Sequence, residues 1–122
     1  MQSANKTSEA LSDVVLLVED EPLIAMTAEM MLEDLGVRNI RTAHNVAEAM
    51  AVLDETTVDL AILDYYLGRE NSVAVAERLA KDGVRFAFAS GAAPMDLPES
   101  CIGAPHVMKP YSLRELSKLL KS

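Results

Sequence analysis

Short apolar runs alternate along this chain with longer segments in which apolar side chains recur at helical spacing. Runs that are apolar at successive positions are typical of strands buried on both faces of a parallel sheet. Alternation of such strands with helices predicts right-handed crossovers, with helices covering both faces of the sheet. The runs that predict strands are residues 13–20, the alternating run 37–43, residues 58–64, residues 84–90 and the short run HVM, which leads directly into Lys109.

Helix boundaries are indicated by capping residues, proline and glycine. Pro22 favours the first turn of a helix and Gly36 favours its end, because proline is tolerated at a helix start and glycine adopts the left-handed conformation after the last turn. The methionines of this helix are expected to fill the core. The other helices are predicted behind the cap pair Asn45 and Glu48, over about 72–81, and behind the capping box Ser112 and Glu115.

Two segments lack these patterns. Residues 65–71 are predicted to form a loop. Residues 91–106 hold three prolines and two glycines, and therefore allow no more than about one helical turn near Met95–Ser100. The chain as a whole predicts an α/β fold with a doubly wound, five-stranded parallel sheet and a short or irregular fourth helix. Residues 1–12 are expected to be a flexible tail and residues 13–122 a single domain.

Composition narrows the class of protein. Half of the 122 residues are hydrophobic, which is enough for a core without disulfides or structural metals, and the single cysteine, Cys101, cannot form an internal disulfide. A formal charge of −8 and a pI near 4.6, with no basic stripe, argue against direct binding of nucleic acid. No apolar run approaches the ~18 residues of a membrane span, and the N-terminus does not resemble a secretory signal. A cytoplasmic protein without membrane insertion is expected.

Chemically reactive side chains fall at the ends of four predicted strands. Glu19 and Asp20 follow the first strand, Asp64 ends the third, Ser90 ends the fourth and Lys109 follows the fifth. In open α/β sheets, sites form beyond the carboxyl ends of the strands. Clustered carboxylates repel one another unless a hard cation such as Mg²⁺ lies between them. A lysine and a small hydroxyl beside them predict a site for a phosphoryl group.

Several details of such a site follow from the same residues. Backbone N–H groups of Tyr65 and Gly91 are placed to hold further phosphoryl oxygens, and Asp64 can act as a nucleophile that forms an aspartyl-phosphate. Each feature alone has an ordinary explanation, because an acid after a strand is commonly a turn or a helix cap. Their joint order along one edge of the sheet favours the phosphoryl site.

This order of motifs resembles the receiver domain of two-component response regulators. The resemblance rests on LLVEDEPLIA, LAILDYYLG, FAFASG and HVMKPYS and covers about residues 13–122. It implies a flavodoxin-like (βα)5 fold in which Asp64 accepts a phosphoryl group from a histidine kinase. It also implies that Ser90 and Lys109 contact that group and that the Lys109–Pro110 bond is cis.

The resemblance further implies a metal site. Asp20 and Asp64 are its expected carboxylate ligands, together with the backbone carbonyl of Tyr66, while Glu19 acts indirectly or through water. The expected ion is Mg²⁺, and Mn²⁺ is expected to substitute for it. The segment RFAFASG is similar to the FATGUY-type fourth strand of receivers that are often stand-alone and linked to HWE histidine kinases. In it, Ser90 replaces a threonine, and the two alanines after Gly91 depart from the motif.

Two positions depart from most receivers. His106 stands where Tyr or Phe usually acts as a switch; it is either a smaller switch that titrates near neutral pH or a strand-edge residue without a signalling role. We predict weak coupling between this position and the hydroxyl, with the signal carried by residues 91–105. Tyr66 and Ala92, two residues past Asp64 and Ser90, offer no acid or amide to orient water, which predicts a long-lived phosphoryl group.

The leading hypothesis is a single-domain response regulator that catalyses only its own phosphorylation and dephosphorylation. It is expected to switch binding to a downstream protein or to act as a phosphate sink or relay, as a monomer or as a phosphorylation-linked dimer. The expected contact surface is residues 91–105 with the exposed face of the last helix. The basic residues on that face, Arg114, Lys118 and Lys121, are either part of the contact or an ordinary solvated surface. The alternatives are a pseudo-receiver, disfavoured by the presence of Asp20, Asp64 and Lys109, and an aspartate-nucleophile phosphatase. The phosphatase is disfavoured because Tyr66 occupies the place of its second acid.

Overall fold

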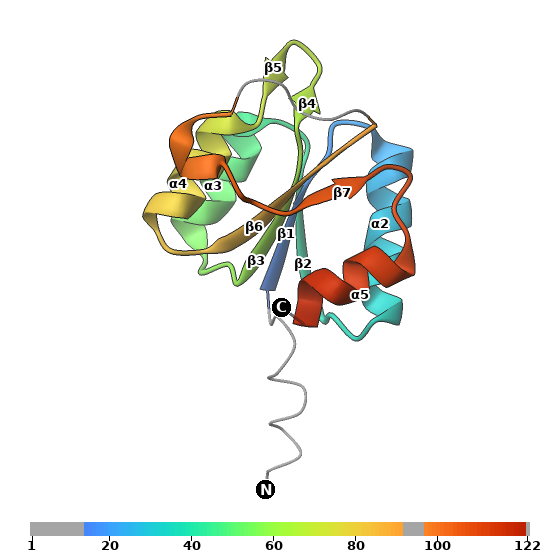
Figure 1. Ribbon diagram of the computed structural model, residues 1–122. Coiled ribbons are helices and arrows are strands. Elements are labelled where there is room, and N and C mark those ends of the chain that lie inside the picture. The colour runs from blue at the N-terminus through green and yellow to red at the C-terminus, as the bar shows by residue number, and fades with distance from the viewer. Residues whose placement is uncertain (1–13, 92–96, 122) are drawn as a thin grey trace, which may run out of the picture.

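The computed structural model describes residues 14–91 and 97–121 and shows a parallel sheet with helices on both faces (Figure 1). The sheet has the strand order β2-β1-β3-β6-β7, so the order reverses next to β1. All of its strand pairs are parallel. The fold is therefore the predicted doubly wound, flavodoxin-like α/β sandwich. Its strands are β1 (Val14–Val18), β2 (Asn39–Ala43), β3 (Leu60–Asp64), β6 (Arg85–Ser90) and β7 (His106–Met108).

The helices form two layers, one on each face of the sheet (Figure 1). One layer holds α2 (Pro22–Asp34) and α5 (Leu113–Lys121), and the other holds α3 (Val46–Glu55) and α4 (Val73–Lys81). The central strand β3 is buried at all five positions. This explains its continuous apolar sequence, because both of its faces lie against a layer of helices.

Alternate side chains of each central strand enter two separate cores. Val15 and Leu17 of β1 pack in the core beneath α2 and α5. Leu16 and Val18 pack in the core beneath α3 and α4, which also receives Phe88 and the buried Cys101. The period of two along a strand thus divides one apolar run between two cores.

The predicted helix signals are confirmed at the residue level. Asn45 caps α3, with its side chain accepting the Glu48 N–H at 2.8 Å. Glu48 Oε1 accepts the His44 N–H at 2.8 Å. The Ser112 hydroxyl accepts the Glu115 N–H at 3.2 Å at the start of α5. Gly36, with φ of 99°, follows α2 in the left-handed region.

The segment predicted as a loop after β3 contains a small hairpin, so that prediction was wrong. Strands β4 (Tyr66–Leu67) and β5 (Glu70–Asn71) pair in antiparallel orientation. Gly68, with φ of 66°, takes the first position of the two-residue turn between them. Strands of two residues are too short to produce a recognisable alternation, which is why the sequence pattern did not show them.

Two other expectations had different outcomes: the broken fourth helix is confirmed in the described residues, whereas the placement of the α2 methionines is corrected. Between β6 and β7, where a short or irregular helix was expected, the described residues contain only the 3-10 turn η1 (Glu99–Cys101), as the prolines and glycines predicted. Residues 92–96 lie outside the described part. The α2 methionines were expected in the core, but Met26 and Met30 are 53% and 58% exposed, and only Met31 packs against the core. Sequence periodicity did not separate these positions, because α2 is apolar around much of its circumference.

Among residues 14–91 and 97–121, no helix is both long enough and apolar enough to cross a membrane.

Candidate functional site

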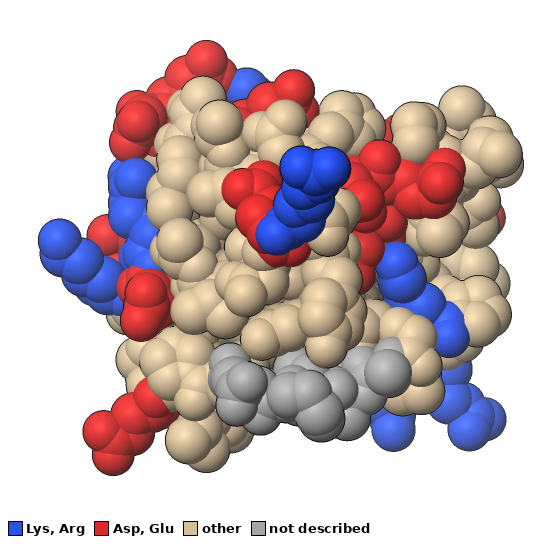
Figure 2. Space-filling view, turned by 90° about the horizontal axis from the view of Figure 1, so that it is seen from above, with Lys and Arg blue, Asp and Glu red and all other residues tan. Residues whose placement is uncertain are grey.

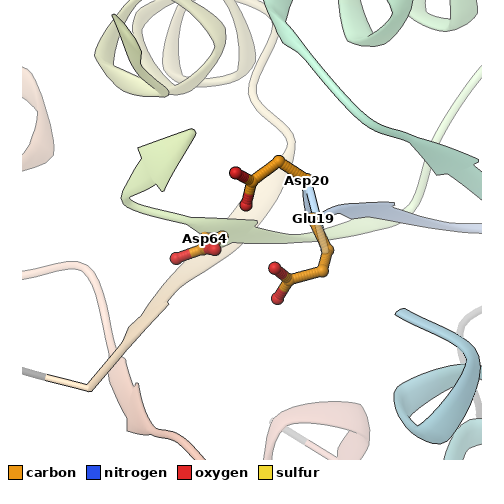
Figure 3. A group of neighbouring side chains, drawn as sticks. All are labelled: Glu19, Asp20 and Asp64. Carbon is orange, nitrogen blue, oxygen red and sulfur yellow. The ribbon is translucent and has the colours of Figure 1, made fainter. Parts of the chain in front are cut away.

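Three carboxylates converge at the carboxyl edge of the sheet. Glu19 and Asp20 follow β1, and Asp64 is the last residue of the neighbouring strand β3. Each offers an oxygen that lies within 4.8 Å of the others. Figure 3 shows the three side chains grouped beyond the strand ends. The parallel register of β1 and β3 creates this cluster, because it places both strand ends at the same height.

Lys109 supplies the cation for this cluster from the segment after β7. Its Nζ donates to Glu19 Oε1 at 3.0 Å and to Asp64 Oδ2 at 3.0 Å. Glu19 is 0% and Asp64 4% exposed, whereas Asp20 faces solvent. Figure 2 shows acidic side chains gathered on this face of the molecule, with a basic side chain among them. One ammonium group opposite three carboxylates leaves an excess of negative charge.

Burial and mutual contact shift the pKa values of this cluster. Burial raises the pKa of Glu19 to about 7, although the Lys109 ammonium lowers it, and the nearby Asp64 carboxylate raises it further. Burial by itself lowers the pKa of Lys109, but its hydrogen bonds to Asp64 and Glu19 outweigh that effect and leave the pKa raised. Lys109 is therefore a fixed positive charge at neutral pH.

The three carboxylates repel one another at this distance, and a hard divalent cation between them would relieve that repulsion. Carboxylate oxygens are the ligands that Mg²⁺ prefers, and the exposed Asp20 leaves room for the waters it retains. Glu19 already accepts from Lys109 and from the Glu21 N–H at 3.2 Å. That arrangement agrees with an indirect role for Glu19. The β4–β5 hairpin packs close by, since a side-chain carbon on Gly68 would lie 3.9 Å from Asp20 Oδ2.

Ser90 and His106 meet beside this cluster. Ser90 is 1% exposed at the end of β6, and its Oγ lies 3.1 Å from Nε2 of the exposed His106. Strands β6 and β7 pair in register so that Ser90 lies opposite Met108. Both residues were predicted to lie near the site, whereas this direct contact between them was not predicted. The strength of their coupling on phosphorylation stays a prediction.

The predicted role for the Tyr65 N–H was wrong. That N–H donates to the Ala89 carbonyl at 2.9 Å, because Tyr65 continues the pairing of β3 with β6. Its single proton is thereby taken up within the sheet. The Tyr65 ring is buried and packs edge-on against Tyr66, with centroids 4.7 Å apart. Gly91 is exposed, and its N–H stays a predicted contact for the phosphoryl group.

Backbone geometry joins the remaining predicted residues to the site. The Lys109–Pro110 peptide bond is cis, as predicted. The Lys109 N–H donates to the Ser90 carbonyl at 3.0 Å, which ties the lysine to the end of β6. Tyr66 lies in β4 directly after the acidic strand end, with 48% of its surface exposed. Its carbonyl stays a predicted metal ligand.

Two residues near the site were not assigned to it from the sequence. His44 Nδ1 lies 3.0 Å from the Glu19 carbonyl oxygen. Tyr111 is 6% exposed, and among the described residues its hydroxyl has no hydrogen-bond partner. Burial raises the pKa of Tyr111, and the charges of Glu19 and Asp64 raise it further. The position of His44 directly after the second predicted strand could have indicated that it lies near the site. Nothing in the sequence indicated that Tyr111 is buried beside the same carboxylates.

One protein-family model matches almost the whole described chain. The model of the response regulator receiver domain matches residues 15–121. The chain belongs to this family. The receiver-domain assignment made from the four motifs is thereby confirmed, and it places the protein in two-component signalling. The FATGUY-type subgroup is not addressed by this match.

Solved structures and curated relatives agree with the affiliation. SdrG from Sphingomonas melonis Fr1 is 39% identical with a TM-score of 0.76, and the alignment covers 91% of this receiver and 94% of SdrG. TrrA from Thermotoga maritima, solved in complex with Mg²⁺–BeF, is 26% identical with a TM-score of 0.76 and coverages of 87% and 94%. PhoB, the phosphate regulon regulatory protein of Pseudomonas aeruginosa, is 30% identical over 115 residues, which make up 88% of this chain and 50% of PhoB. The chain spans half or less of the length of the curated relatives it matches.

Proposed function

We propose that this receiver accepts a phosphoryl group from a histidine kinase on Asp64 in a Mg²⁺-dependent reaction. The observation that supports it most strongly is the Lys109 ammonium shared between Asp64 and Glu19, beside the solvent-facing Asp20. A lysine in this place offsets part of the negative charge of the carboxylates before phosphorylation, and it lies close to the Asp64 oxygens that would react. The metal ligands would be Asp20, Asp64 and the Tyr66 carbonyl, with Glu19 acting indirectly. Mn²⁺ is proposed to substitute.

The chemistry follows from the positions of these side chains. An Asp64 carboxylate oxygen attacks phosphorus while the bond from phosphorus to the donor imidazole nitrogen breaks, and that nitrogen leaves with the electron pair. The bound cation would neutralise charge on the transferring oxygens. Lys109 Nζ, 3.0 Å from Asp64 Oδ2, orients the nucleophile and then pairs with a phosphoryl oxygen. Ser90, buried at the neighbouring strand end, donates a hydrogen bond from its hydroxyl to another phosphoryl oxygen.

The proposed biological role is that of a switch or phosphate sink. The protein would catalyse its own phosphorylation and dephosphorylation and act on no other substrate. A kinase of the HWE type is supported by the similarity of RFAFASG to the FATGUY-type strand. Phosphorylation would change binding to a downstream protein, or drain phosphoryl groups from a shared kinase. Cytoplasmic localisation and a monomeric resting state belong to the same proposal.

The direct test is phosphoryl transfer to Asp64. The chain is incubated with Mg²⁺ and a phosphorylated histidine kinase, and the covalent product is detected by intact mass spectrometry. We expect one phosphoryl group on the wild-type chain and none on Asp64→Asn, because the amide lacks the nucleophilic oxygen. Asp34→Asn, an exposed site at the end of α2, is the matched control and should be labelled normally.

Other outcomes of the same assay identify the alternatives. Transfer that persists in Asp64→Asn would place the acceptor elsewhere. A wild-type chain that is never labelled would be a pseudo-receiver. Turnover of small phosphate esters would indicate the aspartate-nucleophile phosphatase.

A further inference from the structure

The Ser90–His106 hydrogen bond is a feature that the proposed function does not use. Ser90 Oγ and His106 Nε2 lie 3.1 Å apart, between adjacent strands. Ser90 is 1% exposed, while His106 is exposed at the first position of β7. The ring of an exposed residue therefore reaches a buried hydroxyl at the carboxyl edge of the sheet. A phenylalanine at this position has no atom that can make the same contact.

The polarity of this hydrogen bond matters because a hydroxyl has a single proton. If Ser90 donates to His106, it has no proton left for a phosphoryl oxygen. If His106 donates to Ser90, the hydroxyl proton does not point at the imidazole and can be directed toward a phosphoryl oxygen on Asp64 instead. A neutral imidazole carries one N–H, so the second arrangement requires the proton on Nε2. The exposure of His106 lets water satisfy Nδ1 in that tautomer.

We propose that His106 is a positioning residue for phosphoryl transfer. Its Nε2–H donates to Ser90 Oγ and thereby directs the Ser90 proton to a phosphoryl oxygen on Asp64. The inference rests on the proposed function, since it assumes that Asp64 carries the phosphoryl group. His106 thereby has a role in the reaction, whereas its sequence position alone allowed either a switch or a strand-edge residue without a signalling role.

Nuclear magnetic resonance of the imidazole nitrogens tests the direction of the hydrogen bond. With Mg²⁺ and beryllofluoride at about pH 8, we expect the Nε2–H tautomer of His106. We also expect a visible Nε2 proton, protected from exchange with water by Ser90. His44 is the internal reference, because its Nδ1 lies 3.0 Å from a carbonyl oxygen that can only accept.

Two spectroscopic results overturn the proposal. One is the Nδ1–H tautomer of His106 in the beryllofluoride state. The other is an Nε2 proton signal that is unchanged in Ser90→Ala, because protection would then come from elsewhere. These measurements need no His106 variant and therefore do not depend on the stability of one.

A substitution series tests the positioning role in the reaction itself. His106→Phe keeps an aromatic ring without a donor, and we expect phosphorylation by a small phosphodonor to slow about three- to tenfold, the worth of one hydrogen bond. His106→Gln keeps an N–H at the reach of Nε2 and should return within about twofold of wild type. His106→Asn, which is shorter, should resemble His106→Phe. Thermal unfolding of each variant verifies that the fold is intact.

The outcomes separate this inference from the proposed function. Wild-type rates in His106→Phe, or no recovery in His106→Gln, overturn the positioning role alone while Asp64 is still labelled. Absence of labelling in the wild-type chain removes the proposed function and the inference together.

Discussion

Glu19 carries a carboxyl group that is fully buried between Lys109 and Asp64. Burial raises its pKa from 4.5 to about 7, so the folded protein holds its proton more tightly than the unfolded chain does. The resulting stabilisation is complete below about pH 4.5 and is lost as the pH rises through about 7. We therefore expect the free energy of unfolding of the metal-free chain to fall between pH 5 and pH 8. The expected loss is on the order of 1–3 kcal/mol.

Urea denaturation in a chelator at several pH values measures this effect. Glu19→Gln removes the titrating group, so the difference in unfolding free energy between wild type and this variant should change with pH in the stated direction. Glu33→Gln, at an exposed position of α2, is the control and should follow wild type. A difference between wild type and Glu19→Gln that is constant with pH would contradict the shifted pKa.

At the scale of elements, α2 presents an apolar surface next to the site. Leu23, Met26 and Met30 are 71%, 53% and 58% exposed and share one side of the helix by their spacing. An apolar groove of about 440 Å³, lined in part by Leu23, lies between α2 and the segment Lys109–Tyr111. A kinase that presents its phosphohistidine to Asp64 has to lie over the carboxyl edge of the sheet, where α2 also begins. We expect the kinase to contact α2, in addition to the surface predicted from the sequence.

Charge substitutions distinguish these two surfaces. Met26→Asp should slow transfer from the kinase about tenfold more than it slows phosphorylation by a small phosphodonor, because the small donor needs no docking surface. Ile102→Asp is the matched comparison, since Ile102 is 68% exposed and lies next to η1 in the 91–105 segment. Selective loss in Ile102→Asp with normal transfer in Met26→Asp would assign kinase docking to the sequence-predicted surface.

At the scale of the whole molecule, metal binding and folding are linked. The carboxylates come from the ends of two strands, so they are assembled only in the folded chain. A cation that binds the folded state alone raises stability by about 1.4 kcal/mol at ten times its dissociation constant. We expect Mg²⁺ to raise the unfolding temperature by several degrees and Asp20→Asn to remove most of that increase. Calorimetry with and without a chelator measures it.

The net charge of −8 requires a separate control. Screening by any salt reduces repulsion in an acidic protein, so the Mg²⁺ series is compared with NaCl at equal ionic strength. An equal increase in unfolding temperature with NaCl, or an undiminished Mg²⁺ effect in Asp20→Asn, would argue against a specific site.

Local sequence signals were sufficient for much of this fold. The run LAILD is apolar throughout because β3 is covered on both faces, and Asn45 indicates the start of α3 through a single side chain. The functional residues at the strand ends were also predictable, since parallel strands place their carboxyl ends on one edge. The β4–β5 hairpin was not, because its strands have two residues each and Gly68 alone indicates a turn.

The sequence by itself therefore determined the order of the main strands and α-helices and the charged and hydroxyl residues at the strand ends. Tertiary structure decided which atoms meet: Lys109 with both Glu19 and Asp64, His106 with Ser90, and the Tyr65 N–H with the neighbouring strand. It also decided that Met26 and Met30 face outward. The physical reason is that local patterns depend on neighbours along the chain, whereas hydrogen-bond partners and burial depend on the register of strands and the packing of helices that are distant in sequence.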